Sequence, residues 1–422
     1  MKEILKVRGG IELTGEVSIG GAKNSLVALI PASIITKSIV KLENVMPIED
    51  TYTLINILEK LNVSVLYDDK SILYIDARKI KNIKLDNEDM KKMRASYYFM
   101  GALLSLFNRI ETIGPGGCNF GNRPIDLHLF SFSNLGFKYN ENNGVYSFFK
   151  CGKVAREFTF EKKSVGATIN AILASCRIRG KIKINNCSLE PEVDDLINFL
   201  NKCGCSIFRE NESIIIEGKS KLQGCSYTVM PDRIEAGTFM IIGGCLGNHL
   251  KIKNIDIKHL KNVIQVLEKI GVEIIVKGDY LIVNRKNKYK GIDVEVLPYP
   301  GFPTDLQQPL SVLLSLCNED SSIKETIYPA RLSQIESLNK MNALINVEDD
   351  VIKICGNREF VSAEVDGKDL RGGISLVIAG LIASGESLIG GVKYIKRGYS
   401  DLVRKLRKIG ADVKIERVEK YE

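Results

Sequence analysis

The sequence predicts an α/β protein with two similar domains, each assembled from three repeated units. The first observation is a helix end that stops at Gly or Asn and recurs six times along the chain. The second is the alternating apolar segment, typical of a β-strand, that follows these stops. The third is the length of 422 residues, which allows two or three domains at about 150 residues each.

The repeated helix ends share the pattern Leu-x-Lys-apolar-Gly/Asn, with one looser copy that ends in Leu-Gly. Gly and Asn are expected there because helices often end in a left-handed residue, a conformation that these two adopt at low cost. Any α/β protein has some glycines between helices and strands, but near-equal spacings of 74, 68, 67, 71 and 68 residues favour internal repetition. The final residues of the six helix ends are Asn62, Gly136, Gly204, Gly271, Asn342 and Gly410.

Two of the segments after these stops predict β-hairpins. Apolar residues alternate over 63–67 and 72–75, and polar residues separate the two runs. The same pattern recurs over 272–276 and 280–283. A unit of helices and a hairpin cannot bury its apolar faces alone, so several units must share a core. We therefore expect three units in each of two domains.

The composition excludes several functional classes. The 59 Lys and Arg exceed the 51 Asp and Glu by 59 − 51 = 8, but basic and acidic residues are interleaved. The basic clusters at 286–290 and 393–408 lack interleaved aromatic residues, which favours solvated surface over a nucleic-acid site. The apolar stretch 26–35 is far shorter than the roughly 20 residues of a membrane span. Residues 2–8 carry charges where a signal peptide would have its apolar region. We therefore expect a cytoplasmic protein without membrane association.

The ten cysteines have neither CxxC spacing nor the neighbouring histidines of a zinc site. We expect most of them to be reduced residues of the core. Cys118 departs from this pattern because it lies within residues 113–128, which hold four glycines and two prolines. This composition predicts an exposed, mobile loop without helix or central strand.

The chemistry of this loop suits an anion. Arg123 can stabilise a thiolate at Cys118 or an anionic substrate, and the amides of a Gly-rich loop favour anions. An incidental surface turn is the alternative interpretation. Neither GxGxxG after a strand nor GxxxxGK[ST] occurs, so the common dinucleotide and nucleoside-triphosphate motifs are absent from the sequence.

Over its full length the chain resembles the UDP-N-acetylglucosamine 1-carboxyvinyltransferases, a family of enolpyruvyl transferases. Eight motifs occur in the family's order: Gly20–Asn24, Met93–Ser96, Pro115–His128, Ser164–Thr168, Pro231–Glu235, Phe302–Asp305, Asp369–Arg371 and Arg397–Tyr399. The resemblance implies that each domain consists of three βαβαββ units with helices inside and sheets outside, an inside-out α/β barrel. It implies domains at 23–230 and at 1–22 with 231–422, and an active site in the cleft between them.

The implied reaction transfers the enolpyruvyl group of phosphoenolpyruvate to the 3-hydroxyl of UDP-N-acetylglucosamine and opens peptidoglycan precursor synthesis. By resemblance, Cys118 donates a proton and can form a covalent adduct with phosphoenolpyruvate, Asp305 is the base, and Lys23 and Arg397 complete the catalytic set. No metal or cofactor is implied. The implied phosphoenolpyruvate ligands are Lys23, Asn24, Arg123, Arg331, Arg371 and Arg397. The implied nucleotide-sugar ligands are Arg94, Arg123, Pro124, Ile125, Asp126, Leu127, Lys162, Lys163, Ser164, Val165, Asp305 and Ile327.

Each assignment has a structural alternative. The cations Lys23, Arg94, Arg371 and Arg397 could form surface salt bridges. Asp305 could cap a helix. His128 is expected to be a structural hydrogen-bonding residue, and Cys203 and Cys205 are expected to pack in the core.

The sequence departs from the family at three places. Residues 328–331 read Tyr-Pro-Ala-Arg, where the family usually has an aromatic residue followed by Glu-Asn-Arg. Ser131 replaces a usual glycine, and Gly372-Gly373 replaces the commoner pair of small residues. These changes leave open a divergent paralogue with an altered acceptor, or a non-catalytic relative that binds the nucleotide sugar. The sister enolpyruvyl transferase that acts on shikimate 3-phosphate is a further alternative, but it lacks the Cys118 loop.

Overall fold

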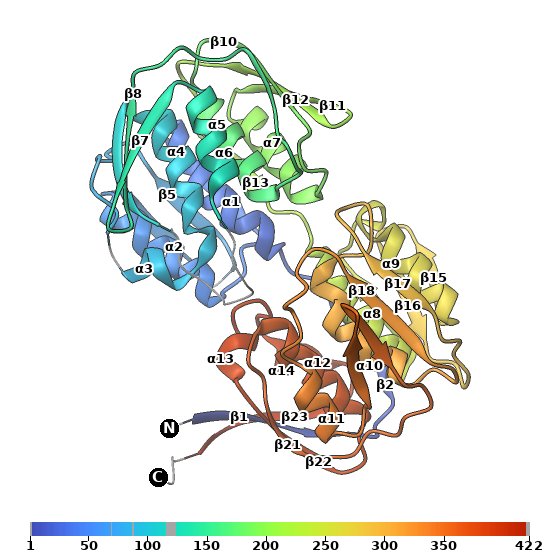
Figure 1. Ribbon diagram of the computed structural model, residues 1–422. Helices are drawn as coiled ribbons and strands as arrows, with labels where there is room; N and C mark the ends of the chain where they lie inside the picture. Colours follow the sequence, from blue (N-terminus) through green and yellow to red (C-terminus); the bar gives the residue numbers. More distant parts are fainter. Residues whose placement is uncertain (1, 69, 87, 115–123, 419–422) are drawn as a thin grey trace. The chain divides into compact units, whose positions relative to one another are not determined.

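The computed structural model describes residues 2–68, 70–86, 88–114 and 124–418, and its chain divides into two compact units. One unit comprises Gly21–Met230 and is called here the Lys23 unit. The other combines Met1–Gly20 with Pro231–Glu422 and is called the Asp305 unit. The chain passes between the units after residue 20 and again after residue 230 (Figure 1).

The described residues of the Lys23 unit form three sheets, with the strand orders β13-β3-β5-β4, β6-β8-β7 and β11-β12-β10-β9. Its helices are α1 (Lys23–Ser33), η1 (Ile34–Thr36), α2 (Glu49–Lys60), α3 (Glu88–Lys92), η2 (Arg94–Tyr97), α4 (Tyr98–Leu106), α5 (Asp126–Asn134), α6 (Val165–Ser175) and α7 (Pro191–Lys202). Its strands are β3 (Ile39–Glu43), β4 (Ser64–Tyr67), β5 (Leu73–Asp76), β6 (Arg109–Ile113), β7 (Phe137–Asn142), β8 (Val145–Lys150), β9 (Glu157–Thr159), β10 (Gly180–Asn185), β11 (Ser206–Glu210), β12 (Ser213–Gly218) and β13 (Ser226–Thr228).

The Asp305 unit also contains three sheets, with the orders β15-β16-β14-β2, β17-β18-β20-β19 and β21-β22-β1-β23. Its helices are α8 (Arg233–Leu246), α9 (Ile257–Ile270), η3 (Thr304–Leu306), α10 (Gln307–Ser315), α11 (Ile335–Lys340), α12 (Leu370–Ile382), α13 (Val392–Ile395) and α14 (Leu402–Lys408). Its strands are β1 (Lys2–Arg8), β2 (Leu13–Ser18), β14 (Gly247–Lys253), β15 (Glu273–Lys277), β16 (Tyr280–Asn284), β17 (Asp293–Val296), β18 (Ser321–Glu325), β19 (Ile345–Glu348), β20 (Val351–Ile354), β21 (Glu364–Asp366), β22 (Glu386–Gly390) and β23 (Asp412–Val418).

The structure confirms the sixfold repeat. All six marker residues adopt the left-handed conformation, with φ between 62° at Asn62 and 108° at Gly271. Each of the first five is followed by an antiparallel hairpin, formed by β4–β5, β7–β8, β11–β12, β15–β16 and β19–β20. The sixth marker, Gly410, is followed by β23, which pairs antiparallel with the N-terminal strand β1. The N-terminal segment therefore supplies the missing strand of the sixth hairpin.

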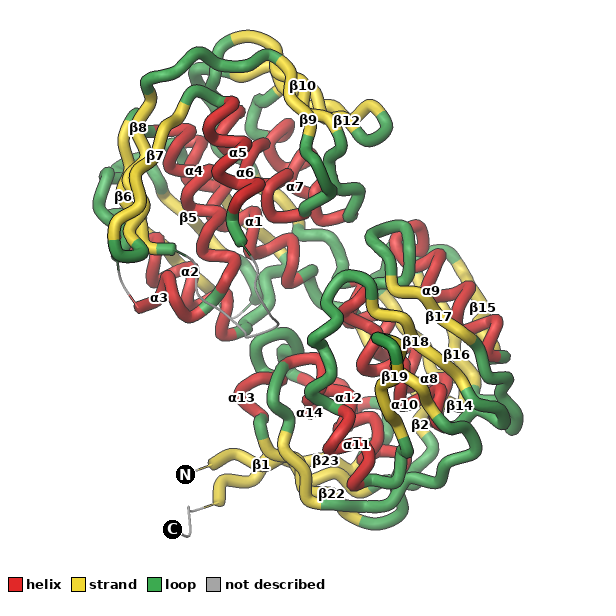
Figure 2. The backbone as a smooth tube through the Cα atoms, viewed as in Figure 1, coloured by secondary structure: helices red, strands yellow, loops and turns green. Residues whose placement is uncertain are grey.

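The helices occupy the inside of each unit. In the Lys23 unit α4 packs on both α1 and α6, and in the Asp305 unit α8, α10 and α12 pack on one another. These central helices are apolar around most of their circumference, and every residue of α8 except Arg233 is buried. Figure 2 shows the strands on the outside of these helices. Each unit has its own apolar core, so the expected architecture of helices inside and sheets outside is confirmed.

Most described cysteines lie in the core, as expected. Six are buried, Cys225 and Cys355 are partly buried, and Cys151 is exposed. Within the described ranges, no helix combines the length and apolar character needed to cross a membrane. The same residues contain no group of three or more His, Cys, Asp or Glu side chains suited to hold a metal ion.

Candidate functional site

In the Lys23 unit, the first turn of α1 presents a cation. Lys23 is the first residue of α1, and its Nζ lies 3.1 Å from Oδ2 of Asp50 in α2. The side chain of Asp50 is only 5% exposed and that of Lys23 19% exposed, so this pair is not an ordinary surface salt bridge. Asn24 follows Lys23 and is partly exposed. The N–H groups of a first helical turn lack partners within the helix, which suits an anion beside Lys23.

A second group of predicted ligands lies where η2 approaches the start of α5. The Nη2 of Arg94 is 3.5 Å from the carbonyl oxygen of Pro124, a weak contact, and the guanidinium lies 5.7 Å from the ring centroid of Tyr97. Ile125 precedes α5, Asp126 is exposed in its first turn, and Leu127 is buried.

The structure corrects the prediction that residues 113–128 contain no helix, whereas the exclusion of a central strand is not contradicted, because Ile113 belongs to the edge strand β6. Ile113 ends β6 and pairs with Val145 of the neighbouring strand, while α5 begins at Asp126. Residues 125–135 contain no glycine or proline that would prevent a helix. Cys118 and Arg123 lie outside the described residues.

His128 in α5 is the structural residue that the sequence predicts. Its imidazole is 5% exposed, its Nδ1 lies 2.8 Å from Nδ2 of Asn170, and its ring lies 4.5 Å from that of Tyr97. Burial, with a smaller contribution from the charge of Arg94, lowers the pKa of His128 to about 3. The imidazole is therefore neutral at pH 7, and it supports Tyr97 and the start of α5.

The run 162–165 leads into α6. Ser164 caps this helix and accepts a hydrogen bond of 3.3 Å from the amide of Ala167. Lys163 pairs with Glu212, whereas Lys162 is exposed. Val165, the first residue of α6, is partly buried. The run is therefore the ordered start of α6. Lys163 contacts the turn between β11 and β12, and Lys162 is exposed to solvent.

In the Asp305 unit, two arginines hold the candidate base. The Nη1 of Arg331 lies 2.7 Å from Oδ1 of Asp305, and the Nη2 of Arg371 lies 3.0 Å from Oδ2. The side chains of Arg331 and Arg371 are 7% and 6% exposed, whereas that of Asp305 is 22% exposed. Burial excludes a surface role for Arg371. Asp305 lies inside η3, and the cap positions of η3 and α10 are occupied by Pro303 and Leu306, so Asp305 is not at the position that the helix-cap alternative requires.

The contacts of Arg371 continue into the core. Its Nη1 lies 2.9 Å from the hydroxyl of Tyr399, which lies 2.8 Å from Oγ1 of Thr238 in α8. Burial acts to lower the pKa of the Arg371 guanidinium, but the Asp305 carboxylate and Tyr399 outweigh it and raise the pKa above its ordinary value. Burial is also the main reason that the pKa of the Tyr399 hydroxyl is raised. Arg371 is therefore a permanent cation between Asp305 and a neutral phenol.

The segment that departs from the family forms a tight turn beside Asp305. Glu325 accepts hydrogen bonds from the amides of Ile327 at 2.9 Å and Tyr328 at 3.0 Å, and from Thr304 Oγ1 at 2.8 Å. The amide of Arg331 donates to the carbonyl of Tyr328 at 2.9 Å, which closes the turn over residues 329 and 330. The turn tolerates Pro329 because this closing bond uses the amide of residue 331.

The remaining predicted ligands lie at the ends of short elements. Arg397 is partly exposed in the turn after α13, where its amide donates to the carbonyl of Tyr394 at 3.2 Å. Ile327 is partly buried and packs against the core. Ser131 is not a predicted ligand, but it stands where the family usually has glycine. It is buried in α5, and its hydroxyl donates to the carbonyl of His128 at 2.8 Å.

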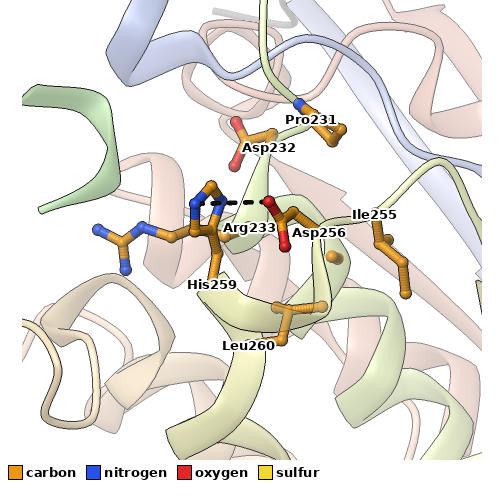
Figure 3. A pocket seen from close by; sticks show the side chains of 8 residues that line it. Pro231, Asp232, Arg233, Ile255, Asp256, His259 and Leu260 are labelled. Atoms are coloured by element: carbon orange, nitrogen blue, oxygen red, sulfur yellow. Dashed lines mark ion pairs between the residues drawn. The ribbon is translucent and has the colours of Figure 1, made fainter. Parts of the chain in front are cut away.

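A pocket in the Asp305 unit is lined in part by residues of the Pro231–Glu235 motif (Figure 3). Its empty volume of about 150 Å³ is below the roughly 300–1,000 Å³ of typical small-molecule sites. At its rim Nε2 of His259 lies 3.7 Å from Oδ2 of Asp256. None of the described predicted ligands lines it, but the charge of its lining residue Asp232 contributes to the raised pKa of both Arg371 and Tyr399, so the pocket lies beside the candidate site. The lining residues are Pro231, Asp232, Arg233, Ala236, Ile255, Asp256, His259 and Leu260.

Three contributors to these groups were missed by sequence reasoning. Asp50 contacts Lys23, and no sequence signal connects the two. Thr304 links Glu325 to Arg331 through one hydroxyl, although it is adjacent to Asp305 in the sequence. Tyr399 is part of the Arg397–Tyr399 motif, and this position was the available signal for a role.

The fold and the family comparison define the class of protein. The family model described as EPSP synthase (3-phosphoshikimate 1-carboxyvinyltransferase) matches residues 7–406. The enolpyruvyl transferase NikO from Streptomyces tendae shares the fold with a TM-score of 0.89 at 23% identity, covering 98% of this chain and 99% of that one. EPSP synthase from Acinetobacter baumannii shares it with a TM-score of 0.74 at 16% identity, covering 99% and 100%. The fold is therefore that of the enolpyruvyl transferases.

Curated relatives narrow the class. UDP-N-acetylglucosamine 1-carboxyvinyltransferase 2 of Listeria monocytogenes is 42% identical over 98% of both chains. UDP-N-acetylglucosamine 1-carboxyvinyltransferase of Clostridium botulinum is 40% identical over 97% of this chain and 99% of its own. The chain belongs to the UDP-N-acetylglucosamine 1-carboxyvinyltransferase family.

Proposed function

We propose that the protein transfers the enolpyruvyl group of phosphoenolpyruvate to the 3-hydroxyl of UDP-N-acetylglucosamine and releases phosphate. This reaction is the first committed step of peptidoglycan precursor synthesis. The observation that carries the proposal is the 40–42% identity, over nearly the whole chain, to curated enzymes of that name. We further propose that the reaction takes place in the cytoplasm.

The fixed cations suit the charges of phosphoenolpyruvate. We assign Lys23, Asn24, Arg123 and Arg397 to its phosphate and carboxylate. Arg331 and Arg371 hold Asp305, but a guanidinium has five N–H donors, so both can also donate to a bound anion. The residues assigned to the nucleotide sugar are Arg94, Arg123–Leu127, Lys162–Val165, Asp305 and Ile327.

The reaction needs one acid and one base. Cys118 protonates carbon 3 of phosphoenolpyruvate, and the 3-hydroxyl oxygen attacks carbon 2 as Asp305 accepts the hydroxyl proton. In the second half, carbon 3 loses a proton, the carbon–oxygen bond to phosphate breaks, and the carbon–carbon double bond is restored. Cations at fixed positions stabilise the phosphate that leaves, so the chemistry requires no metal or cofactor.

The test is acceptor-dependent release of phosphate. We expect the purified protein to release phosphate from phosphoenolpyruvate when UDP-N-acetylglucosamine is supplied. Release with shikimate 3-phosphate instead, or without any acceptor, would contradict the proposal. Calorimetric binding of UDP-N-acetylglucosamine without any phosphate release would favour the non-catalytic relative, which the replaced Glu-Asn pair at 329–330 motivates.

A further inference from the structure

Four cysteines of the Lys23 unit, none of them assigned to the reaction, gather at the C-terminal end of α7. The Sγ atoms of Cys203 and Cys225 are 3.3 Å apart. Cys176 and Cys205 interact with each other beside them. Cys203 is buried, whereas Cys225 is partly exposed, so one thiol of the closest pair is accessible from solvent.

The backbone holds Cys203 and Cys225 together. Cys203 directly follows the last residue of α7, and Cys225 directly precedes β13. The amide of Gln223 donates to the carbonyl of Cys203 at 2.9 Å, and the amide of Lys41 in β3 donates to the carbonyl of Cys225 at 2.9 Å. The proximity of the two sulfurs therefore follows from the hydrogen bonds of their chain segments.

Side-chain packing on β13 reinforces this arrangement. The hydroxyl of Tyr227 lies 2.6 Å from Oδ1 of Asp195 in α7, and its ring lies 5.5 Å from that of Phe199. The Nζ of Lys202 lies 5.9 Å from the centroid of the Tyr227 ring. Tyr227 thus joins strand β13 to helix α7 next to the sulfur pair.

The two thiols have different acidities. The hydrogen bond with Cys203 is the main influence that lowers the pKa of Cys225; burial opposes it and the charge of Lys202 adds to it. The same hydrogen bond, together with burial, raises the pKa of Cys203. The more exposed sulfur is therefore the better thiolate, and its buried neighbour keeps its proton.

We propose that Cys203 and Cys225 form an oxidisable pair, a modification site that a low-molecular-weight disulfide converts to an intramolecular disulfide. The thiolate of Cys225 attacks one sulfur of the small disulfide, which forms a mixed disulfide and releases one thiolate. The thiol of Cys203 then loses its proton, and its sulfur attacks the sulfur of Cys225 and displaces the second small thiolate. In total, two cysteine thiols are oxidised and one small disulfide is reduced to two thiols.

The sulfurs must approach from 3.3 Å to about 2.05 Å. Residues 219–225 form no helix or strand, so this side of the pair can adjust. The new bond closes the loop between residues 203 and 225, which limits the unfolded chain and raises the melting temperature. No group assigned to the reaction belongs to this loop, so we expect the activity to remain.

The experiment treats the full-length protein with glutathione disulfide, blocks the remaining thiols by alkylation, and maps the peptides by mass spectrometry. We expect a linked pair of peptides containing Cys203 and Cys225, lighter by two hydrogen atoms and separated by dithiothreitol. The variants Cys203→Ser and Cys225→Ser should not form this link. The matched control Cys151→Ser, which removes an exposed cysteine, should form it as the unmodified sequence does.

Three results would overturn the proposal. These are a link between Cys176 and Cys205 instead, a glutathione adduct on Cys225 that Cys203 never displaces, and a pair that stays reduced while Cys151 is modified. The linkage is mapped in the unmodified sequence, so the test does not depend on the folding of a variant. An oxidised form whose melting temperature is not above that of the reduced form would contradict the expected loop closure.

Discussion

The Nη2 of Arg371 lies 3.0 Å from Oδ2 of Asp305, although 66 residues separate them in the sequence. The second terminal nitrogen of the same guanidinium lies 2.9 Å from the hydroxyl of Tyr399. Arg371 thus connects the candidate base to a buried phenol. The orientation of the carboxylate therefore depends on core residues that are not expected to contact a substrate.

Asp305→Asn tests the role of this carboxylate as the base. The amide keeps the shape of the side chain but cannot accept the hydroxyl proton, so we expect turnover to fall roughly 10²- to 10⁴-fold. Acceptor-dependent phosphate release measures turnover, and calorimetry should still detect binding of UDP-N-acetylglucosamine. Asp279→Asn, in the exposed turn between β15 and β16, is the matched control. Full activity of Asp305→Asn would remove Asp305 from the proposed mechanism.

Tyr399→Phe tests whether the phenol positions Arg371. The variant removes the acceptor of Arg371 Nη1, while Thr238 keeps its hydrogen bond to the carbonyl of Ile234 at 2.8 Å. We expect a loss of about 1–3 kcal/mol in the free energy of unfolding. Because Asp305 and Arg371 shift, kcat should fall roughly 10-fold or more.

A purely structural role for Tyr399 would change stability without changing the kinetics. The KM for UDP-N-acetylglucosamine should stay near its original value, since Tyr399 is not assigned to that substrate. Tyr394→Phe in α13 is the control and should leave both kcat and stability close to those of the unmodified sequence. An unchanged kcat for Tyr399→Phe would refute the positioning role.

His128 predicts a pH dependence of stability. Its pKa is about 3 in the folded protein, against 6.5 for an unperturbed histidine, so the unfolded chain binds the extra proton first. The contribution of His128 is complete above pH 6.5 and decreases as the pH falls toward 3. The slope in this window is about 1.4 kcal/mol per pH unit.

Denaturant unfolding at pH 7, 6 and 5 measures this effect by comparison of the unmodified sequence with His128→Gln. The variant loses hydrogen bonding at every pH, but its stability should fall less on acidification. His249→Gln, at an exposed position, should retain the slope of the unmodified sequence. A constant difference between His128→Gln and the unmodified sequence at all three pH values would show that His128 is not the titrating group.

Fosfomycin, a small epoxide phosphonate, should alkylate Cys118. A thiolate opens the epoxide, and Arg123 is expected to stabilise both this thiolate and the phosphonate. We expect faster alkylation when UDP-N-acetylglucosamine is present, as judged by intact mass against time. Peptide mapping locates the adduct, and Cys118→Ser should prevent it. An adduct on the exposed Cys151 would refute this assignment.

The sequence predicts well those features that depend on neighbouring residues. The stops at Asn62, Gly271 and Gly410 are visible because a left-handed helix end restricts the residue type locally. The hairpins are visible because a strand with one buried face alternates its residues. The start of α5 was missed because the glycines before residue 122 dominate the composition of the window around it.

Pairings between distant segments could not be predicted in this way. Strand β2 lies parallel to β14 and strand β13 lies parallel to β3, and these pairs close sheets with segments more than 180 residues apart. The pairing of β1 with β23 completes the sixth hairpin. Neither local propensity nor apolar periodicity specifies the partner of an edge strand, because each pattern describes only its own segment.

The sequence by itself determined the α/β class, the sixfold repeat and, through its motifs, the family and the candidate site residues. Only the tertiary structure decided that Asp305 lies between Arg331 and Arg371, that Tyr399 supports Arg371, and that Asp50 pairs with Lys23. The physical reason is the separation along the sequence between the residues that determine each feature. Helix ends and strand alternation depend on residues a few positions apart, whereas these contacts depend on how the core of each unit brings distant segments of its chain together.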